Sequence, residues 1–319
     1  VVVYPHIYPE FSADFTGCHP HPVDFTNETE AYGGLDNATY LWTFGNGVES
    51  NFTHFSQNYY NASLTRDTTF TVTLRAFSEH GCTDQISHDV TVYPKPQSRM
   101  ELLSGYFGCS PFEVEIQNLS EGKNYGTTLN FDFDFGDGSP PLNTTSTNNV
   151  FHLFPSNLID DVESYLITLL VETEDGCTDT SFQTIYIYPE VQALFSFDPS
   201  DAACNPFLVQ IENNSINGFF FQWDFGDGLL SNLFEPNHLF INNSTLDREF
   251  DVTLTAISEF ECVSSLTLPV TVYAAPVADF VINPPLKVFP DADFAFVNHT
   301  NPQDPNWTYY WTFGDGYDF

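Results

Sequence analysis

The sequence has 319 residues, with 43 Asp or Glu against 7 Lys or Arg, which gives a formal net charge of −36 at pH 7. So acidic a surface argues against nucleic acid or anionic lipid as a partner and favours a salty or cation-rich exterior, where charges are screened. Regular apolar alternation argues against disorder despite the charge. No stretch is long and apolar enough to cross a bilayer as a helix.

One hexapeptide pattern, aromatic–polar–Phe–Gly–(Asp or Asn)–Gly, divides the chain into repeats. Its copies span 42–47, 133–138, 223–228 and 311–316, at steps of 91, 90 and 88 residues. A period near 90 is right for whole domains in tandem. The alternation followed by Gly-Asp-Gly predicts a strand with one buried aromatic face that ends in a hairpin turn.

Other features recur around this hexapeptide. The early cysteines Cys18, Cys109 and Cys204 precede it, and the late cysteines Cys82, Cys177 and Cys262 follow it. Before each late cysteine lies a Val/Ile-Thr-Leu strand, at 72–74, 167–169 and 252–254. Each complete repeat then closes on an alternating strand, at 90–93, 185–188 and 270–273.

This arrangement resembles the PKD domain, an immunoglobulin-like β-sandwich with a Trp-Asp-Phe-Gly-Asp-Gly signature and a later Val-Thr-Leu strand. With Cys-x-Pro early and Gly-Cys late, it is similar to PKD arrays in cell-surface proteins of Bacteroidetes, including gliding and adhesion proteins. The resemblance covers essentially the whole chain. It implies an all-β fold of tandem immunoglobulin-like sandwiches arranged end to end, and it does not specify a function.

The expected division is a closing strand of a preceding repeat at 1–8, three PKD-like domains at 9–94 (repeat 1), 95–189 (repeat 2) and 190–274 (repeat 3), and a partial one at 275–319 (repeat 4). We therefore expect this chain to be a segment of a longer array. The short Pro-containing linkers predict neighbouring domains held as a stiff rod.

Two cysteines per complete repeat suggest the pairs Cys18–Cys82, Cys109–Cys177 and Cys204–Cys262, with separations of 64, 68 and 58 residues. Loops of this length stabilise a domain by roughly 4 kcal/mol in the chain-entropy model. Zinc is disfavoured because CxxC spacing is absent. Repeat 4 has Phe289 where its early cysteine would stand. Disulfides imply an oxidising, extracellular location.

The acidic turns are the candidate metal sites, since carboxylates beside backbone carbonyls suit Ca²⁺. The residues concerned are Asp134, Asp137, Asp224, Asp227 and Asp315. Simple turn formation is the alternative, and alternation places Asp134 and Asp224 on the solvent face. The recurring His54, His152 and His238 are expected to be half-buried and hydrogen-bonded within each sandwich rather than catalytic.

Eleven Asn-x-Ser/Thr sequons are present. Asn27, Asn118, Asn213 and Asn298 occupy one repeat position, where Asn side chains can bond turn backbone, so a structural role explains them without sugar. The others are candidate glycosylation sites: Asn37, Asn51, Asn61, Asn143, Asn242, Asn243 and Asn306.

No GxSxG, HExxH or P-loop motif is present, so catalysis is not expected. We favour a structural or adhesive segment of a cell-surface filament, stalk or adhesin; the alternative is an accessory stalk of a secreted polysaccharide- or protein-degrading hydrolase. Expected partners are further repeats of the same chain, identical chains in a filament or sheath, and surface polysaccharide. Lateral assembly through exposed aromatics such as Tyr59 and Tyr60 is a third possibility.

Overall fold

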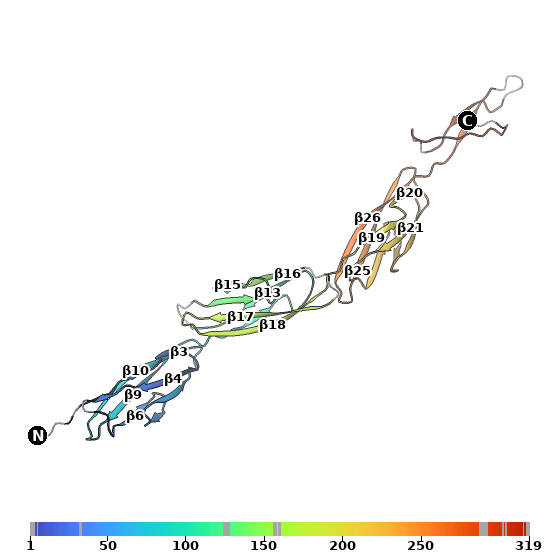
Figure 1. Cartoon of the computed structure of the whole chain (residues 1–319). Coiled ribbons are helices and arrows are strands. Elements are labelled where there is room, and N and C mark those ends of the chain that lie inside the picture. Colours follow the sequence, from blue (N-terminus) through green and yellow to red (C-terminus); the bar gives the residue numbers. More distant parts are fainter. Residues whose placement is uncertain are drawn as a thin grey trace. The chain divides into compact units, whose positions relative to one another are not determined.

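The computed structural model describes residues 4, 6–31, 34–123, 128–155, 158, 161–286, 293–301, 303, 305–314 and 316 (Figure 1). Every secondary-structure element in this part of the chain is a β-strand. Strands β2 to β26, apart from β5, form three repeated pairs of sheets, so the all-β, tandem immunoglobulin-like fold class expected from the sequence is confirmed.

Repeat 1 contains ten strands. They are β1 (Ile7–Tyr8), β2 (Phe11–Ser12), β3 (Thr16–Cys18), β4 (His21–Asn27), β5 (Glu30–Ala31), β6 (Thr39–Thr43), β7 (Glu49–Ser50), β8 (Phe55–Tyr59), β9 (Thr68–Phe77) and β10 (Thr83–Tyr93). The larger sheet has the order β3-β10-β9-β6-β7, and the smaller sheet has the order β2-β4-β8. Strand β1 pairs with β5, so residues Ile7 and Tyr8 belong to the sheets of repeat 1.

Repeat 2 has the same plan. Its strands are β11 (Met100–Leu102), β12 (Phe107–Cys109), β13 (Phe112–Asn118), β14 (Asn130–Asp134), β15 (Leu142–Thr144), β16 (Val150–Phe154), β17 (Glu163–Glu172) and β18 (Thr178–Tyr188). The sheet orders are β12-β18-β17-β14-β15 and β11-β13-β16. The order of strands therefore matches that of repeat 1 position by position.

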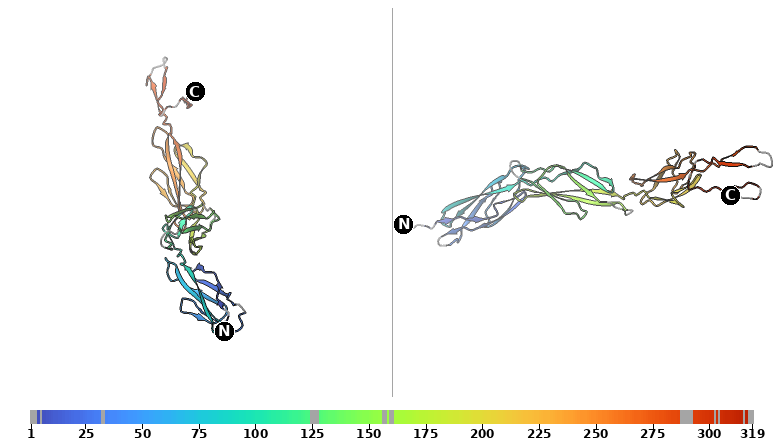
Figure 2. Two further views of the ribbon diagram at one scale, coloured as in Figure 1. Left: turned by 90° about the vertical axis from the view of Figure 1, so that its left-hand side faces the viewer. Right: turned by 90° about the horizontal axis from the view of Figure 1, so that it is seen from above.

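Repeat 3 follows this plan again, and Figure 2 shows its two layers of strands in yellow to orange. Its strands are β19 (Phe195–Asp198), β20 (Ala202–Cys204), β21 (Phe207–Asn213), β22 (Phe220–Asp224), β23 (Leu230–Ser231), β24 (Asn237–Phe240), β25 (Arg248–Ile257) and β26 (Val263–Tyr273). The sheet orders are β20-β26-β25-β22-β23 and β19-β21-β24. In repeat 4, β27 (Phe280–Asn283) pairs with β28 (Ala295–Asn298).

The hexapeptide strands supply the centre of each core. Trp42, Phe133 and Trp223 are almost fully buried, as are the Phe residues two positions further on. Asp134 and Asp224, between these aromatics, are exposed. Successive side chains on a strand point to opposite faces, so the alternating sequence produces one apolar face for each core.

The hairpin after each of these strands depends on its first glycine. Gly45, Gly136 and Gly226 have φ of 73°, 75° and 74°. A Cβ atom at these positions would lie 2.7–2.8 Å from a backbone oxygen of β9, β17 and β25, respectively. Only glycine combines this conformation with so close an approach.

The chain divides into two compact units. Unit 1 is Val1–Pro155 with Glu163–Ile187, and unit 2 is Ser156–Val162 with Tyr188–Phe319. Unit 1 thus holds the sheets of repeats 1 and 2, and unit 2 holds those of repeats 3 and 4. The finer boundaries given above stay predictions.

Candidate functional site

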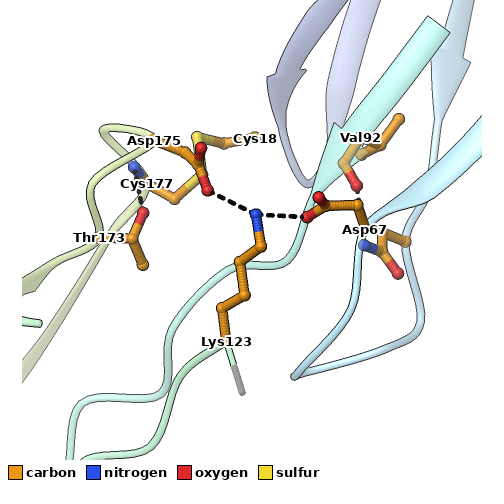
Figure 3. Close-up of a disulfide and its surroundings, with 8 residues drawn as sticks. Cys18, Asp67, Val92, Lys123, Thr173, Asp175 and Cys177 are labelled. Carbon is orange, nitrogen blue, oxygen red and sulfur yellow. Dashed lines mark hydrogen bonds and ion pairs between the residues drawn. A yellow bond between two sulfur atoms is a disulfide. The ribbon is translucent and has the colours of Figure 1, made fainter. Parts of the chain in front are cut away.

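A disulfide joins repeat 1 to repeat 2 within unit 1 (Figure 3). Cys18 is the last residue of β3, and Cys177 lies in the turn between β17 and β18. Their Cα atoms are 5.5 Å apart, and their sequence separation is 159. The bond therefore links residues far apart in the chain, at the place where one repeat ends and the next begins. We call this region, with Asp67, Tyr93–Arg99 and Lys123, the joint.

The expected pairing within each repeat is wrong. Cys18 bonds Cys177, which rules out both Cys18–Cys82 and Cys109–Cys177. Cys82 and Cys204 are free thiols, so Cys204–Cys262 is also wrong. Cys109 and Cys262 are each disulfide-bonded.

The long closing strand is the physical reason for this outcome. Cys18 lies opposite Tyr93, the last residue of β10, whereas Cys82 comes just before Thr83, the first. A strand of 11 residues rises about 3.3 Å per residue, so its ends are roughly 30 Å apart. Disulfide geometry needs Cα atoms within about 7 Å. Cys18 and Cys82 therefore lie at opposite ends of β10, too far apart to form a disulfide.

Cys177 is held by a tight turn. The Thr173 N–H donates to the Cys177 carbonyl (2.9 Å), the Gly176 N–H donates to the Thr173 carbonyl (2.9 Å), and the Cys177 N–H donates to Thr173 Oγ1 (3.1 Å). In repeat 1, Ser78 and Cys82 form the same turn with the same bonds, yet Cys82 is unpaired. The turn therefore forms without the bridge.

Lys123 of repeat 2 connects both repeats beside the disulfide. Its Nζ lies 2.9 Å from Asp67 Oδ1 of repeat 1 and 3.1 Å from Asp175 Oδ2 of repeat 2. It also lies 5.1 Å from the ring centroid of Tyr93. Burial acts to lower the pKa of Lys123, but the hydrogen bonds and charges of Asp67 and Asp175 outweigh it, so the pKa lies above its ordinary value. Figure 3 shows the ammonium between the two carboxylates.

The linker is anchored on repeat 2 by polar contacts. Lys95 Nζ lies 2.7 Å from Asp179 Oδ1, and the Ser98 N–H donates to Asp179 Oδ2 (2.8 Å). Ser98 Oγ donates to the Leu169 carbonyl (2.9 Å). Burial acts to raise the pKa of Asp179, but its bonds with Lys95 and Ser98 hold the pKa below its ordinary value. These contacts hold the linker on repeat 2, and Lys123 connects repeat 2 to Asp67 of repeat 1.

The recurring histidines are hydrogen-bonded within their sandwiches, as expected, but only His152 is half-buried, since His54 is exposed and His238 is buried. His152 Nε2 lies 2.8 Å from Asp137 Oδ2, and His238 Nε2 lies 2.8 Å from Asp227 Oδ2. His54 instead accepts from the Asn27 N–H (3.1 Å). Sequence reasoning missed the His–Asp pairs. The available signal was Asn46, which stands in repeat 1 where repeats 2 and 3 have the paired Asp, and it is in repeat 1 that the histidine is bonded differently.

The carboxylates of the acidic turns mainly bind turn backbone. Asp134 and Asp224 each accept from the N–H of the glycine two residues on (2.9 Å). Asp137 Oδ1 accepts from the Ser139 N–H (2.9 Å), and Asp227 Oδ1 accepts from the Leu229 N–H (3.0 Å). Among the residues that the structure describes, no three His, Cys, Asp or Glu side chains are grouped so as to hold a metal ion. Asp315 lies outside the described residues, and the Ca²⁺ hypothesis stays a prediction.

The four sequons at one repeat position have the structural role expected of them. The Oδ1 atoms of Asn27, Asn118, Asn213 and Asn298 accept the backbone N–H two residues on, at 3.0, 3.0, 3.0 and 2.9 Å. This Asx turn ends the strand in each repeat and explains the recurrence.

Two candidate glycosylation sites are also structural. Asn61 and Asn242 are buried, with 4% and 2% of the residue exposed. Each Nδ2 donates two bonds, from Asn61 to the Arg66 and Val92 carbonyls and from Asn242 to the Leu246 and Val272 carbonyls. A sugar would break these bonds, so both assignments are corrected. The other candidates, Asn37, Asn51, Asn143, Asn243 and Asn306, are exposed and stay predictions.

Only one of the two tyrosines proposed for lateral assembly is accessible. Tyr59 is 0% exposed, and its hydroxyl donates to the Phe44 carbonyl (3.2 Å). Burial raises its pKa. Tyr60 is exposed. Neighbouring residues at a strand end point to opposite faces, so the pair could not both face solvent.

No protein-family model and no curated protein matches the chain. Among solved structures, it is similar to the PKD1 domain of the Vibrio cholerae metalloprotease PrtV (24% identity, 28% of this chain, 98% of that chain, TM-score 0.22). It is also similar to a Ca²⁺-stabilised adhesin with which an Antarctic bacterium binds ice (11%, 89%, 77%, 0.35) and to immunoglobulin domains 1–5 of Sidekick-1 (12%, 86%, 60%, 0.33). These likenesses concern the fold alone. No helix long and apolar enough to cross a membrane occurs in the described residues.

Proposed function

We propose that this chain is a structural segment of a long extracellular repeat protein that builds a cell-surface filament, stalk or adhesin. The observation that supports it most is the disulfide between Cys18 and Cys177, which bonds one repeat to the next. A spacer that transmits force gains from a covalent link between its modules, whereas a catalytic or ligand-binding domain does not need one. Disulfides also favour an oxidising compartment outside the cell.

The joint supplies the mechanical part of this function. Lys123 connects Asp67 to Asp175, and Asp179 holds the linker through Lys95 and Ser98. The Lys123–Asp67 ion pair crosses from repeat 2 to repeat 1 and resists rotation of one repeat against the other, while the remaining bonds hold Lys123 and the linker on repeat 2. The net charge of −36 keeps neighbouring chains apart and soluble.

The proposed partners are further repeats of the same chain, identical chains in a filament or sheath, and surface polysaccharide contacted by an adhesive region. Divalent cations bound at the acidic surface, with the exposed Asp134 and Asp224 among the ligands, would further stiffen the array by relieving repulsion. An accessory stalk of a secreted hydrolase is the competing function.

Labelling of intact source cells with an antibody against this segment tests the proposal. We expect labelling without permeabilisation, at a distance from the cell envelope that shortens when one repeat pair is deleted in frame. Cell adhesion or surface motility should fall with that distance. Recovery of the segment only in the medium, fused to hydrolytic activity and without effect on adhesion, would instead establish the hydrolase stalk.

A further inference from the structure

The covalent topology of unit 1 differs from that of a simple string of domains. A path along the chain that enters at the N-terminal side reaches Cys18 and can cross directly to Cys177. We infer that this disulfide is a covalent bypass for tension: as long as no second bond leads out of the segment from Cys109, residues between Cys18 and Cys177 cannot be extended by force applied outside them. The bypass rests on the proposed structural function, because that function supplies the force. The disulfide that forms the bypass can nevertheless be tested in the purified chain alone.

Almost all of both sandwiches lies inside the bypassed segment. From repeat 1 it contains β4 to β10, and from repeat 2 it contains β11 to β17. Only β1 to β3 and β18 lie outside it. Strands β4 to β17, which make up most of the four β-layers of unit 1, are thus protected from extension.

The outer strands are well placed to pass the force on. Strand β3 pairs in parallel with the end of β10, with Cys18 opposite Tyr93. Strand β18 pairs with β17 over ten residues, from Glu172 opposite Thr178 to Glu163 opposite Ile187. Force that enters through β3 crosses the disulfide at the joint and leaves along β18. Beside the bond, Lys123 contacts both Asp67 of repeat 1 and Asp175 in the turn that carries Cys177, so ion pairs also connect the two repeats there.

The amount of chain removed from extension is large. A sequence separation of 159 corresponds to roughly 540 Å of extended chain at about 3.4 Å per residue. A bond within repeat 1, from Cys18 to Cys82, would span a separation of 64 and remove only about 220 Å. The two topologies therefore differ by more than twofold in a measurable length.

The repeat structure also provides a matched control. Cys82 lies in the same turn of repeat 1 as Cys177 does in repeat 2, but it is a free thiol. Replacing it changes the same kind of turn without touching the bridge. Cys82→Ser should therefore leave the extensible length unchanged.

Single-molecule force spectroscopy of the full 319-residue chain, tethered at its two ends, tests the bypass. Cys109 and Cys262 are disulfide-bonded as well, so the measurement uses the Cys109→Ser/Cys262→Ser variant, oxidised and then with a reductant. We expect the fully extended length to be shorter by about 540 Å in the oxidised form. Repeat 3 should unfold with the same step in both forms and serves as the internal standard. Adding Cys177→Ser should abolish the difference, and adding Cys82→Ser should preserve it.

Equal lengths with and without reductant, in protein shown to contain one disulfide before the reductant is added, would overturn the bypass. A difference near 220 Å would overturn it equally, because it would mean pairing within repeat 1. If adding Cys177→Ser prevents folding, the Cys109→Ser/Cys262→Ser variant, measured before and after reduction, still compares the chain with and without the Cys18–Cys177 bond. Failure of surface labelling would contradict the proposed function and leave these lengths unchanged, so the two claims fail separately.

Discussion

The linker of unit 1 and the corresponding linker of unit 2 share a backbone frame but differ in side-chain chemistry. In unit 1, Gln97 forms an antiparallel β-bridge with Glu121, and in unit 2, Gln192 forms the same bridge with Ile216. The chain thus enters repeats 2 and 3 in the same way. What surrounds this bridge is polar in one unit and apolar in the other.

The aromatic residue that ends the closing strand shows the difference best. Tyr93 in unit 1 lies against the ammonium of Lys123. Its equivalent in unit 2, Tyr188, stacks on Phe260 with ring centroids 4.4 Å apart and an interplanar angle of 6°. Phe260 occupies the turn position of Asp175, and Gly218 stands in place of Lys123.

The linker anchors differ in the same sense. Ser98 in unit 1 donates to the carboxylate of Asp179, whereas the Ala193 N–H in unit 2 donates to the hydroxyl of Ser264 (3.1 Å). Ala193 is buried and packs in the core of repeat 3. The comparison teaches that the same backbone bridge starts repeats 2 and 3, while its surroundings are charged in unit 1 and aromatic in unit 2. The two units should therefore respond differently to mutation, salt and pH.

Loss of the disulfide should have the largest effect on unit 1. After cleavage at a protease site engineered into the linker, repeats 1 and 2 should stay bonded on a non-reducing gel and separate on a reducing one. Cys177→Ser should make them separate on both, and Cys82→Ser should behave as the unchanged protein. Closing a loop of 159 residues is worth about 5 kcal/mol in the chain-entropy model. Fragments that separate without reductant in the unchanged protein would contradict the bond.

The sequence predicted the sandwiches well because their information is local. Alternation placed Trp223 and Phe225 inside and Asp224 outside, as observed. The Asn-x-Ser/Thr turn after Asn213 is likewise read from adjacent residues. Such features depend on the period of a strand or on a bond two residues away, and both are visible in one repeat.

The disulfide partners were mispredicted because they depend on which end of a strand each cysteine occupies. Cys82 directly precedes the closing strand, and Cys18 pairs alongside the end of that strand. The position of Cys82 just before a long alternating strand was visible in the sequence, but it excludes Cys18 as the partner only once Cys18 is known to lie beside the far end of that strand. The pairing of β3 with β10 was not visible, since it joins the two ends of a repeat. The His152–Asp137 bond is non-local for the same reason.

Removal of the aromatic stack should be the next largest effect, and it is confined to unit 2. Phe260→Ala deletes a partly buried ring that packs against Tyr188 and the core of repeat 3. We expect a loss of about 2 kcal/mol, with little dependence on salt because the contact is apolar. Hydrogen exchange of β25 and β26 in a urea series measures it. A loss that vanishes in 1 M salt would contradict the comparison.

Removal of the bridging lysine should destabilise the joint of unit 1 by about 1 kcal/mol at low salt and by less in 1 M salt. The side chain of Lys123 is 18% exposed, whereas that of Lys95 is 46% exposed, so Lys123→Ala should exceed Lys95→Ala. Hydrogen exchange of the peptides around the linker reports both.

The pH dependence of this contact follows from the raised pKa of Lys123. A raised pKa means that the stabilisation is complete below the ordinary lysine pKa of about 10.4 and is lost as pH rises through the folded value. The measurement is the protection of the linker amides from hydrogen exchange as a function of pH. If this protection declines with pH in Lys123→Ala as much as in the unchanged protein, a group other than Lys123 causes the pH dependence.

The smallest effect is expected at the acid end, from Asp179. Its pKa is lowered in the folded chain, so its stabilisation is present above the ordinary Asp pKa of about 3.9 and is lost as pH falls through the folded value. Asp179→Ser introduces the side chain that unit 2 has at the equivalent position, Ser264. It should reduce, by a few tenths of a kcal/mol, the loss of hydrogen-exchange protection that the linker of unit 1 shows at acid pH. The linker of unit 2 should show no such loss in either protein.

Peptide mapping of the oxidised chain, after alkylation of free thiols and without reduction, tests the central claim most directly. The account predicts a cross-linked peptide that contains Cys18 and Cys177, and alkylated Cys82 and Cys204. A cross-linked peptide that joins Cys18 to Cys82, with no free thiol in the chain, would mean that each repeat closes on itself, and it would contradict the covalent link between repeats.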